Sequence, residues 1–330
     1  MMDLPSLRKE VAASLARTPP HLPPKLFYDE RGAHLFEKIT RLPEYYPTRT
    51  ELGILRTHLP EMSRPAGPGV RLVEFGSGSG EKTELLLESL EQPTAYIPVD
   101  IAREQLNEVA ARLDRRFPGL QVLPLAADYT QPFHLPEPRG ASDSGRGRPL
   151  LFFPGSTLGN FEPQAAQTFL AGAGSSLGPG AALILGVDLE KSPELLLPAY
   201  DDARGVTAEF NRNSLVHLNR LLGTDFRPDA FEHRAVWNQP ASRMEMHLVA
   251  LQPQTVTLPA AQNGSGPRDD QRLDFKIGEH IVTEHSYKYT PQSLQALTTA
   301  AGWKTVQSWT DANEWFLVRF LEWKGPPHER

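Results

Sequence analysis

Hydrophobic side chains recur at helical spacing near the start of the chain and are then interrupted by prolines. Leu, Val and Ala stand three or four positions apart between Leu4 and Leu15, which predicts an amphipathic helix. Prolines at positions 19, 20, 23 and 24 end this pattern. We therefore expect residues 1–60 to form an N-terminal helical cap that contributes to a functional site but is too small to be a domain.

Short hydrophobic runs separated by segments of helical length dominate the chain from residue 70 onwards. Such an alternation predicts parallel strands joined by crossover helices, and therefore an α/β fold. A stretch rich in Gly, Ser and Arg, residues 139–148, predicts a flexible surface loop within this region. The predicted strands are Val70–Gly76, Tyr96–Asp100, Gln121–Asp128, Leu150–Ser156 and Ala181–Asp188.

The pattern changes again after residue 190. Helical spacing over residues 194–222 gives way to extended segments around residues 243–251 and 271–289. We interpret residues 191–290 as a second domain of α+β type, inserted into the first.

The last part of the chain is expected to return to the first sheet. One more helix, Pro291–Ala301, precedes two predicted strands, Lys304–Trp309 and Trp315–Trp323. The first domain is therefore expected to combine residues 61–190 with residues 291–330.

Composition narrows the classes of partner and chemistry. The chain has 34 Lys and Arg against 40 Asp and Glu, and no stripe of basic residues, so we expect no nucleic-acid partner. It has no cysteine, which excludes thiolate nucleophiles and cysteine-ligated metals. Neither a signal peptide nor an apolar run of about eighteen residues is visible. We therefore expect a cytoplasmic monomer that has no membrane partner and acts on a small molecule.

A glycine-rich loop, Gly76–Gly80, follows the first predicted strand and precedes a predicted helix. Glycines allow a tight turn and a close approach of the backbone to a ligand. A phosphate-binding loop would need a glycine directly before Lys82, where Glu81 stands, and the third glycine of a dinucleotide fingerprint would also fall at Glu81. The negative charge at this position suits a cationic ligand.

S-adenosylmethionine is such a ligand, because it carries a sulfonium and an amino group. The acidic residue Glu74 followed by alternate glycines resembles the first motif of class I methyltransferases. Asp100 ends the second predicted strand, where a carboxylate can accept both ribose hydroxyls. Asp128 ends the third predicted strand and Tyr129 follows it, where such enzymes usually contact the adenine. The alternative is a glycine-rich turn with aspartates that only cap helices.

Five longer segments carry a closer resemblance, which extends from about Lys25 to Trp323. They are Leu42–Glu51, Phe152–Phe161, Ala199–Asp202, Arg243–His247 and Thr283–Lys288. Together they resemble the histidine Nα-methyltransferases of ergothioneine biosynthesis. Members of that family use S-adenosylmethionine to methylate the α-amine of histidine three times, giving the betaine hercynine. A related fungal branch methylates a prenylated tryptophan.

The resemblance implies a class I, Rossmann-like parallel sheet with an inserted substrate-binding domain, and it assigns site residues. Tyr28 and Asn160 are implied as catalytic residues, with Tyr28 near the amine, where it accepts a hydrogen bond or relays a proton through water. The implied substrate contacts are Tyr46, Gly155, Asn160, Tyr200, Met246, Glu284 and Ser286. The implied cofactor contacts are Phe36, Glu74, Gly76, Gly78, Lys82, Asp100, Asp128 and Tyr129.

The resemblance implies that Glu284 and Ser286 bind the imidazole ring of the substrate, and their spacing supports this role independently. Residues two apart in a strand share a face, so their side chains point the same way and His285 points to the other face. A carboxylate and a hydroxyl together can accept an imidazole N–H and offer a partner to the other ring nitrogen, whereas an indole has only one N–H. Taken without the resemblance, the sequence favours an ordinary strand on which both side chains face solvent, and the resemblance reverses that preference.

Other interpretations remain open at this stage. His280 and Glu284 lie four apart on one face, but no third ligand is evident, so we expect no metal. The same chemistry on another amino acid or an indole amine, such as a tryptophan derivative, is the main alternative. A catalytically silent relative that only binds these ligands is another. A nicotinamide-dependent oxidoreductase is disfavoured by the glycine spacing.

Overall fold

The chain folds into two compact units, each built from two separate stretches of sequence. The structure is a computed structural model, and it describes residues 4–131, 133–139, 147–260 and 270–325. Unit 1 comprises residues 1–45 and 192–286, and unit 2 comprises residues 46–191 and 287–330. The chain therefore crosses between the units three times, at positions 45/46, 191/192 and 286/287.

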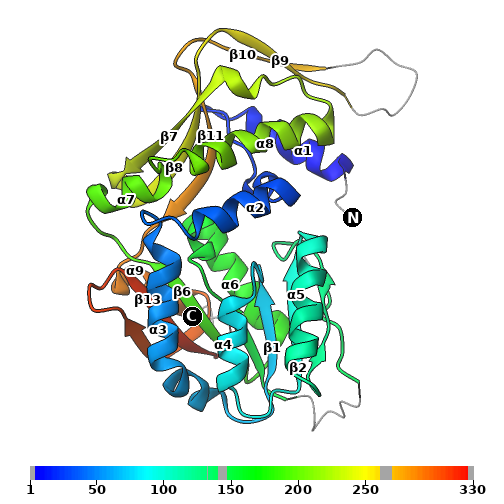
Figure 1. The fold of residues 1–330 in the computed structure, drawn as a ribbon, viewed down its shortest axis with the longest axis vertical. Helices are drawn as coiled ribbons and strands as arrows, with labels where there is room; N and C mark the ends of the chain where they lie inside the picture. The colour runs from blue at the N-terminus through cyan, green and yellow to red at the C-terminus, as the bar shows by residue number, and fades with distance from the viewer. Residues whose placement is uncertain (1–3, 132, 140–146, 261–269, 326–330) are drawn as a thin grey trace, which may run out of the picture. The chain divides into compact units, whose positions relative to one another are not determined.

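Unit 2 contains a mixed, mostly parallel sheet of eight strands (Figure 1). Its strands are β1 (Arg71–Phe75), β2 (Ala95–Asp100), β3 (Gln121–Val122), β4 (Leu125–Ala126), β5 (Pro149–Phe153), β6 (Ala182–Asp188), β12 (Trp303–Thr310) and β13 (Phe316–Trp323). The order is β12-β13-β6-β5-β1-β2-β3, and β4 also pairs with β2. β13 joins β6 in the antiparallel direction and carries β12, so the predicted return of the last two strands is confirmed.

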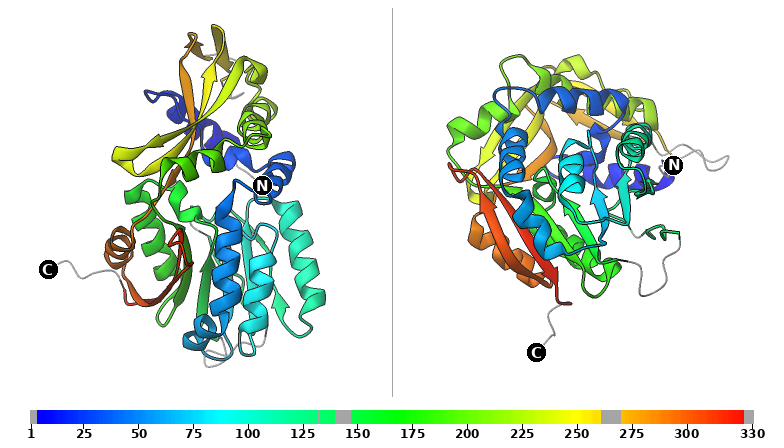
Figure 2. Two further views of the ribbon diagram at one scale, coloured as in Figure 1. Left: turned by 60° about the vertical axis from the view of Figure 1, so that its left-hand side comes forward. Right: turned by 60° about the horizontal axis from the view of Figure 1, so that its bottom comes forward.

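Helices cover both faces of this sheet because its parallel strands are apolar on both sides. They are α3 (Tyr46–Ser63), α4 (Glu81–Ser89), α5 (Arg103–Arg116), α6 (Pro163–Leu177) and α9 (Pro291–Ala300), with short 3-10 turns η2 (Arg64–Ala66) and η3 (Thr157–Asn160). α3, α4 and α5 stand in a row on one face (Figure 2), while α6 and α9 pack in the core of the other. The predicted Rossmann-like α/β arrangement is confirmed.

One predicted strand differs in detail. The segment 121–128 was expected to be continuous, but it forms two short pairs with β2. Pro124 lies between them, and proline has no N–H to donate to the sheet ladder. Asp128 consequently lies two residues beyond β4 rather than at the end of a strand.

Unit 1 combines helices with two small sheets. Its helices are α1 (Leu4–Leu15), α2 (Glu30–Ile39), α7 (Pro193–Tyr200) and α8 (Val206–Leu222), with 3-10 turns η1 (Pro24–Phe27), η4 (Pro228–Ala230) and η5 (Gln239–Ala241). Its strands are β7 (Phe231–Asn238), β8 (Arg243–Ala250), β9 (Gln254–Leu258), β10 (Gln271–Phe275) and β11 (His280–Tyr287). The strands form a three-stranded sheet, β11-β8-β7, and a two-stranded ribbon, β10-β9. α1 packs into the core of this unit, and His21 forms a parallel bridge with Val282.

The units divide the chain differently from the expected domains. Residues 1–60 were expected as one cap, but α3 belongs to unit 2, where Ile54, Leu55 and Leu59 pack in the core beneath the sheet. Residues 1–45 belong to unit 1 because the apolar face of α1 is buried with α8 and β11. Among the described residues, no helix is long and apolar enough to cross a membrane. Most of the expected 139–148 loop lies outside the described residues.

Candidate functional site

The glycine-rich loop lies between β1 and α4 in unit 2. Gly76 and Gly78 have φ of +75° and +50°, a backbone region that residues with a Cβ rarely adopt. A Cβ at Gly78 would have no neighbour within 4 Å, and one at Gly76 would first meet the Tyr129 hydroxyl at 3.9 Å. The loop therefore leaves open space beside its backbone, as a bound ligand requires.

Glu74 fixes the base of this loop from inside the protein. Its side chain is 1% exposed and accepts hydrogen bonds from the hydroxyls of Thr83 (2.7 and 2.9 Å) and Tyr96 (2.5 Å). Burial raises the pKa of Glu74 to about 8, although the two hydroxyls act in the opposite direction. Glu74 was predicted to contact the cofactor, and its partners here join β1 to α4 and β2.

Asp100, Asp128 and Tyr129 follow strands of the same sheet. Asp100 accepts the backbone N–H of Ala102 at 2.9 Å, and burial raises its pKa while N–H groups of the glycine loop oppose that shift. Asp128 accepts the N–H (2.9 Å) and hydroxyl (2.5 Å) of Thr130. The Tyr129 ring stacks on Phe75 with centroids 5.4 Å apart. These three residues lie at or just beyond the carboxyl ends of parallel strands, which is where ligands bind in open α/β sheets.

A buried carboxylate, Glu51 of α3, links two other predicted contacts. It forms an ion pair with Lys82 and accepts the Gly155 N–H on both oxygens, at 2.9 and 3.1 Å. The sequence analysis did not single out Glu51 as a functional residue. A signal was present, because Glu51 continues the buried i, i+4 stripe of Leu55 and Leu59 on α3.

A second buried cluster surrounds Asp188 at the end of β6. Its carboxylate accepts the Tyr46 hydroxyl (2.7 Å) and pairs with the ammonium groups of Lys191 (2.6 Å) and Lys288 (2.7 Å). Burial alone would raise the pKa of Asp188, but the two ammonium groups outweigh it and the pKa is lowered. Burial also lowers the pKa of Lys191 to about 8. The sequence analysis assigned none of these three charged residues a role.

Tyr46, a predicted substrate contact, is part of this buried cluster. Its side chain is 2% exposed, and its hydroxyl donates to Asp188 and accepts from Lys191 at 2.9 Å, so both of its hydrogen-bonding roles are already used. The preceding residue, Tyr45, is half-buried in unit 1, and its ring lies 6.4 Å from that of Tyr200, a predicted substrate contact.

Unit 1 gathers an aromatic set around the N-terminal residues predicted for the site. Tyr28 and Phe36 lie edge to face at 6.0 Å, and both rings lie close to Phe210, at 6.1 and 5.9 Å. Phe36 is also 6.3 Å from Tyr45. Tyr45 in turn links these rings to Tyr200, and aromatic rings of this kind attract a cation through their π faces.

The predicted imidazole-binding strand, β11, also lies in unit 1. The Ser286 and Tyr200 hydroxyls are 2.8 Å apart and buried, which joins two predicted substrate contacts. Glu284 is half-buried, and the intervening His285 instead has the His21 ring 5.4 Å away. Met246 is 3% exposed on β8, and its carbonyl accepts the hydroxyl of Thr283 from β11 at 2.9 Å.

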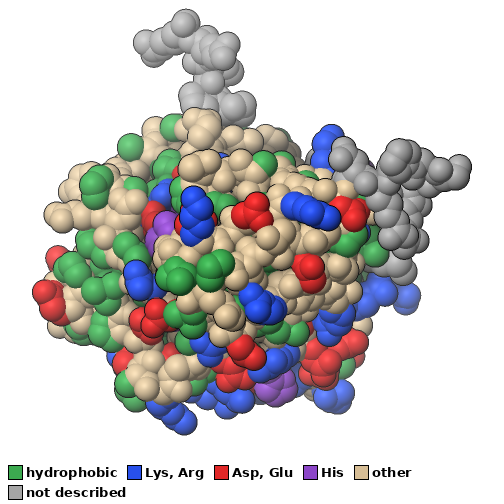
Figure 3. All heavy atoms as spheres, turned by 90° about the horizontal axis from the view of Figure 1, so that it is seen from above, with side chains coloured by type: hydrophobic (Ala, Val, Ile, Leu, Met, Phe, Trp, Pro, Cys, Tyr) green, Lys and Arg blue, Asp and Glu red, His purple; other side chains and the backbone are tan. Residues whose placement is uncertain are grey.

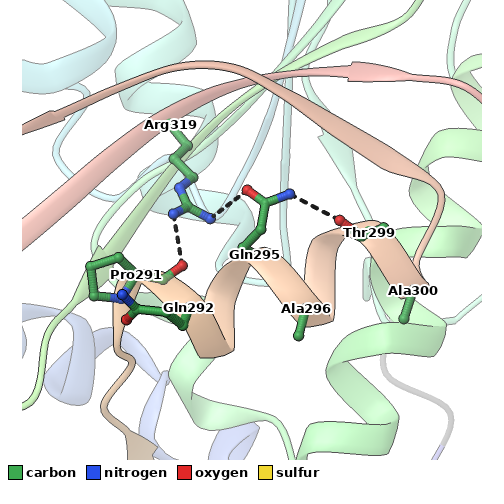
Figure 4. A pocket seen from close by; sticks show the side chains of 7 residues that line it. All are labelled: Pro291, Gln292, Gln295, Ala296, Thr299, Ala300 and Arg319. Carbon is green, nitrogen blue, oxygen red and sulfur yellow. Dashed lines mark hydrogen bonds between the residues drawn. The ribbon is translucent and has the colours of Figure 1, made fainter.

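Asn160 is half-buried at the end of η3 in unit 2. An open groove beside α9 is lined partly by Gln295 and Arg319 (Figure 4), and no predicted site residue borders it. On the face in Figure 3 basic and acidic side chains are intermixed. Within the described ranges, no group of three His, Asp or Glu residues could hold a metal ion.

Comparison with known proteins adds independent findings. A family model described as histidine-specific, S-adenosylmethionine-dependent methyltransferase matches residues 7–323. The histidine N-alpha-methyltransferase of Mycolicibacterium smegmatis is 42% identical over 309 residues, which cover 93% of this chain and 91% of that protein. The match therefore includes both units.

Two fungal relatives are more distant. Ergothioneine biosynthesis protein 1 of Neurospora crassa is 31% identical over 307 residues, 91% of this chain and 33% of that protein. The 4-dimethylallyltryptophan N-methyltransferase of Trichophyton verrucosum is 28% identical over 355 aligned positions, 98% of this chain and 94% of that protein.

Proposed function

Because the chain belongs to the family of histidine-specific, S-adenosylmethionine-dependent methyltransferases, we propose that it methylates the α-amino group of L-histidine three times, forming hercynine for ergothioneine biosynthesis. The observation that carries the choice of substrate is the 2.8 Å contact between Tyr200 and Ser286. We assign Tyr200 to the amine and carboxylate of histidine and Ser286 to its imidazole ring, so this contact supports a substrate that needs polar partners at both groups.

The residues present in unit 2 fit S-adenosylmethionine. Gly76 and Gly78 provide a turn with open space beside it, and the Asp100 carboxylate at the end of β2 suits ribose hydroxyls. The Lys82 ammonium, held by Glu51, suits the carboxylate of the methionine part. When bound, S-adenosylmethionine supplies an electrophilic methyl group on a sulfonium.

The aromatic set of unit 1 suits an amine that becomes a permanent cation. Rings such as Tyr28, Phe36 and Tyr200 attract a cation by about 0.5–2 kcal/mol each, and the attraction does not depend on an N–H that later methylations remove. We assign the substrate contact of the Leu42–Glu51 motif to Tyr45, because the Tyr46 hydroxyl is already paired with Asp188.

Each transfer requires a neutral amine aligned with the methyl group and the departing sulfur. A free α-amine is largely protonated near pH 7, so a proton must leave before each attack. Tyr28 is half-buried beside the aromatic set, and we assign its hydroxyl to accept that hydrogen bond or to pass the proton to water. Asn160 is assigned to hold the amine as a hydrogen-bond partner.

Imidazole selection is assigned to Glu284 and Ser286 on β11. The carboxylate accepts the ring N–H and the hydroxyl pairs with the other ring nitrogen. An alkyl chain would leave both groups without a partner, and an indole, which has one N–H and no ring acceptor, would leave one of them without a partner. Sites that hydrogen-bond a substrate reject analogues lacking the group by large factors, whereas apolar pockets discriminate weakly.

The test measures product mass with S-adenosylmethionine and each amino acid singly, and then compares variants. We expect trimethylation of histidine alone. Glu284→Gln should raise KM for histidine at least tenfold, about 1.4 kcal/mol or more, and leave the Kd of S-adenosylmethionine within twofold. The matched control is Glu232→Gln, an exposed position on β7, which should behave as wild type. Methylation of tryptophan or a derivative, or equal loss of both affinities, would contradict the assignment.

A further inference from the structure

The three crossings of the chain between its units share one anchor. Tyr46 is the first residue after the first crossing, Lys191 is the last before the second, and Lys288 is the second residue after the third. All three contact the carboxylate of Asp188, at 2.7, 2.6 and 2.7 Å. A single buried side chain thus holds every point at which the chain leaves or enters unit 2.

Backbone hydrogen bonds join the same segments. The N–H of Tyr289 donates to the Asp188 carbonyl at 3.1 Å, and the N–H of Glu190 donates to the Tyr289 carbonyl at 2.9 Å. The Ser156 hydroxyl in turn accepts the N–H of Asp188 at 2.9 Å. The anchor is therefore fixed to the sheet on one side and to two of the three crossing segments on the other.

The charges of this cluster are poorly explained by stability alone. Asp188 and Lys288 have side chains with 0% exposure and Lys191 has 5%, so two cations share one buried anion. Desolvation of buried ions offsets much of their attraction, and apolar residues of similar volume often stabilise a fold as well or better. Buried ions do, however, form directional hydrogen bonds, and each of these bonds fixes the position of its donor.

We propose that Asp188 is a positioning residue for methyl transfer, acting through the two crossing segments that carry substrate contacts. Tyr46 is bonded directly to Tyr45, and Lys288 follows Ser286 by two residues. This inference rests on the proposed function, which assigns Tyr45 and Ser286 to the substrate. Holding Tyr46 and Lys288 fixes the backbone from which both contacts extend, and a displacement of about 1 Å can cost a reaction about a hundredfold.

The test uses the full chain and three variants of graded severity. Tyr46→Phe removes one hydroxyl, Lys191→Met removes one of the two cations, and Asp188→Asn removes the anion. Lys324→Met is the matched control, because Lys324 forms an exposed ion pair with Glu322 in the same unit. Each protein is assayed at a temperature at which denaturant curves show it to be fully folded.

We expect Tyr46→Phe and Lys191→Met to lower kcat/KM for histidine at least tenfold while the Kd of S-adenosylmethionine stays within twofold. The double variant should lose no more than the worse single variant, because both act through Asp188. Wild-type kcat/KM in folded Tyr46→Phe and Lys191→Met would overturn the inference, as would equal loss in Lys324→Met. A wild-type chain that methylates another substrate would overturn the proposed function instead, so the two failures are distinguishable.

Discussion

Replacement of Glu74 by glutamine tests how burial controls the base of the glycine loop. The pKa of Glu74 is about 8 in the folded protein, against an ordinary value near 4.5. The folded chain therefore keeps a proton that the unfolded chain has released between these pH values. The free energy of unfolding should therefore fall by about 1.4 kcal/mol per pH unit between pH 4.5 and pH 8, about 5 kcal/mol in all. Above pH 8 Glu74 is ionised in both states, and no further fall is expected from it.

Glutamine cannot ionise, so the variant should lack this loss. Urea denaturation at pH values from 5 to 9 should show the free energy of unfolding of Glu74→Gln rising relative to wild type by about 4 kcal/mol. Glu232→Gln, at an exposed position of β7, should show no such trend. A difference from wild type that stays constant with pH would refute the burial argument.

The same variant also tests the predicted cofactor role. If Glu74 acts only through Thr83 and Tyr96, glutamine preserves its size and polarity, and the Kd of S-adenosylmethionine at pH 6 should change less than threefold. A tenfold or larger loss at that pH would instead indicate that the carboxyl group contacts the cofactor directly.

Two further predictions concern packing and capping. Gly159→Ala should lower the free energy of unfolding by about 1–3 kcal/mol, because its Cβ would lie 2.7 Å from the Tyr287 carbonyl oxygen. Gly172→Ala in α6, where the Cβ meets nothing within 4 Å, should raise it by about 0.5–1 kcal/mol, and equal effects in urea denaturation would contradict this reasoning. Asp29→Ala should cost about 1–3 kcal/mol in the same assay, since Asp29 caps α2 through the Gly32 N–H, and an unchanged midpoint would argue against the cap.

Local patterns were sufficient to predict the central sheet. Buried parallel strands appear in sequence as short, nearly continuous hydrophobic runs, and β1, β2, β5 and β6 all do. The glycine loop was also predictable from a local pattern, because a positive φ at Gly76 strongly limits the residue type at that position. The strand β7 was missed, although buried and exposed positions alternate over its first half, Phe231 to Arg234.

The partners of buried charges were not predictable from the sequence. Tyr46 and Lys288 lie 142 and 100 positions from Asp188, and no local pattern indicates which strand-end aspartate attracts which lysine. The different surroundings of the neighbouring residues Tyr45 and Tyr46 could not be predicted for a related reason. Adjacent residues at the start of a helix point about 100° apart, and a tyrosine pair does not reveal which ring faces the core.

The parallel bridge between His21 and Val282 has a consequence for biosynthesis. These residues are 261 positions apart, so at about 5–20 residues per second a ribosome needs about 13–50 s to supply the partner. Until residues 206–222 are made, Leu7, Val11 and Leu15 lack the α8 side chains that bury them in the finished protein, and they lack Ile281 of β11 for nearly the whole interval. The N-terminal helix is therefore made first and docked late, and chaperones that bind exposed apolar segments should meet the nascent chain there.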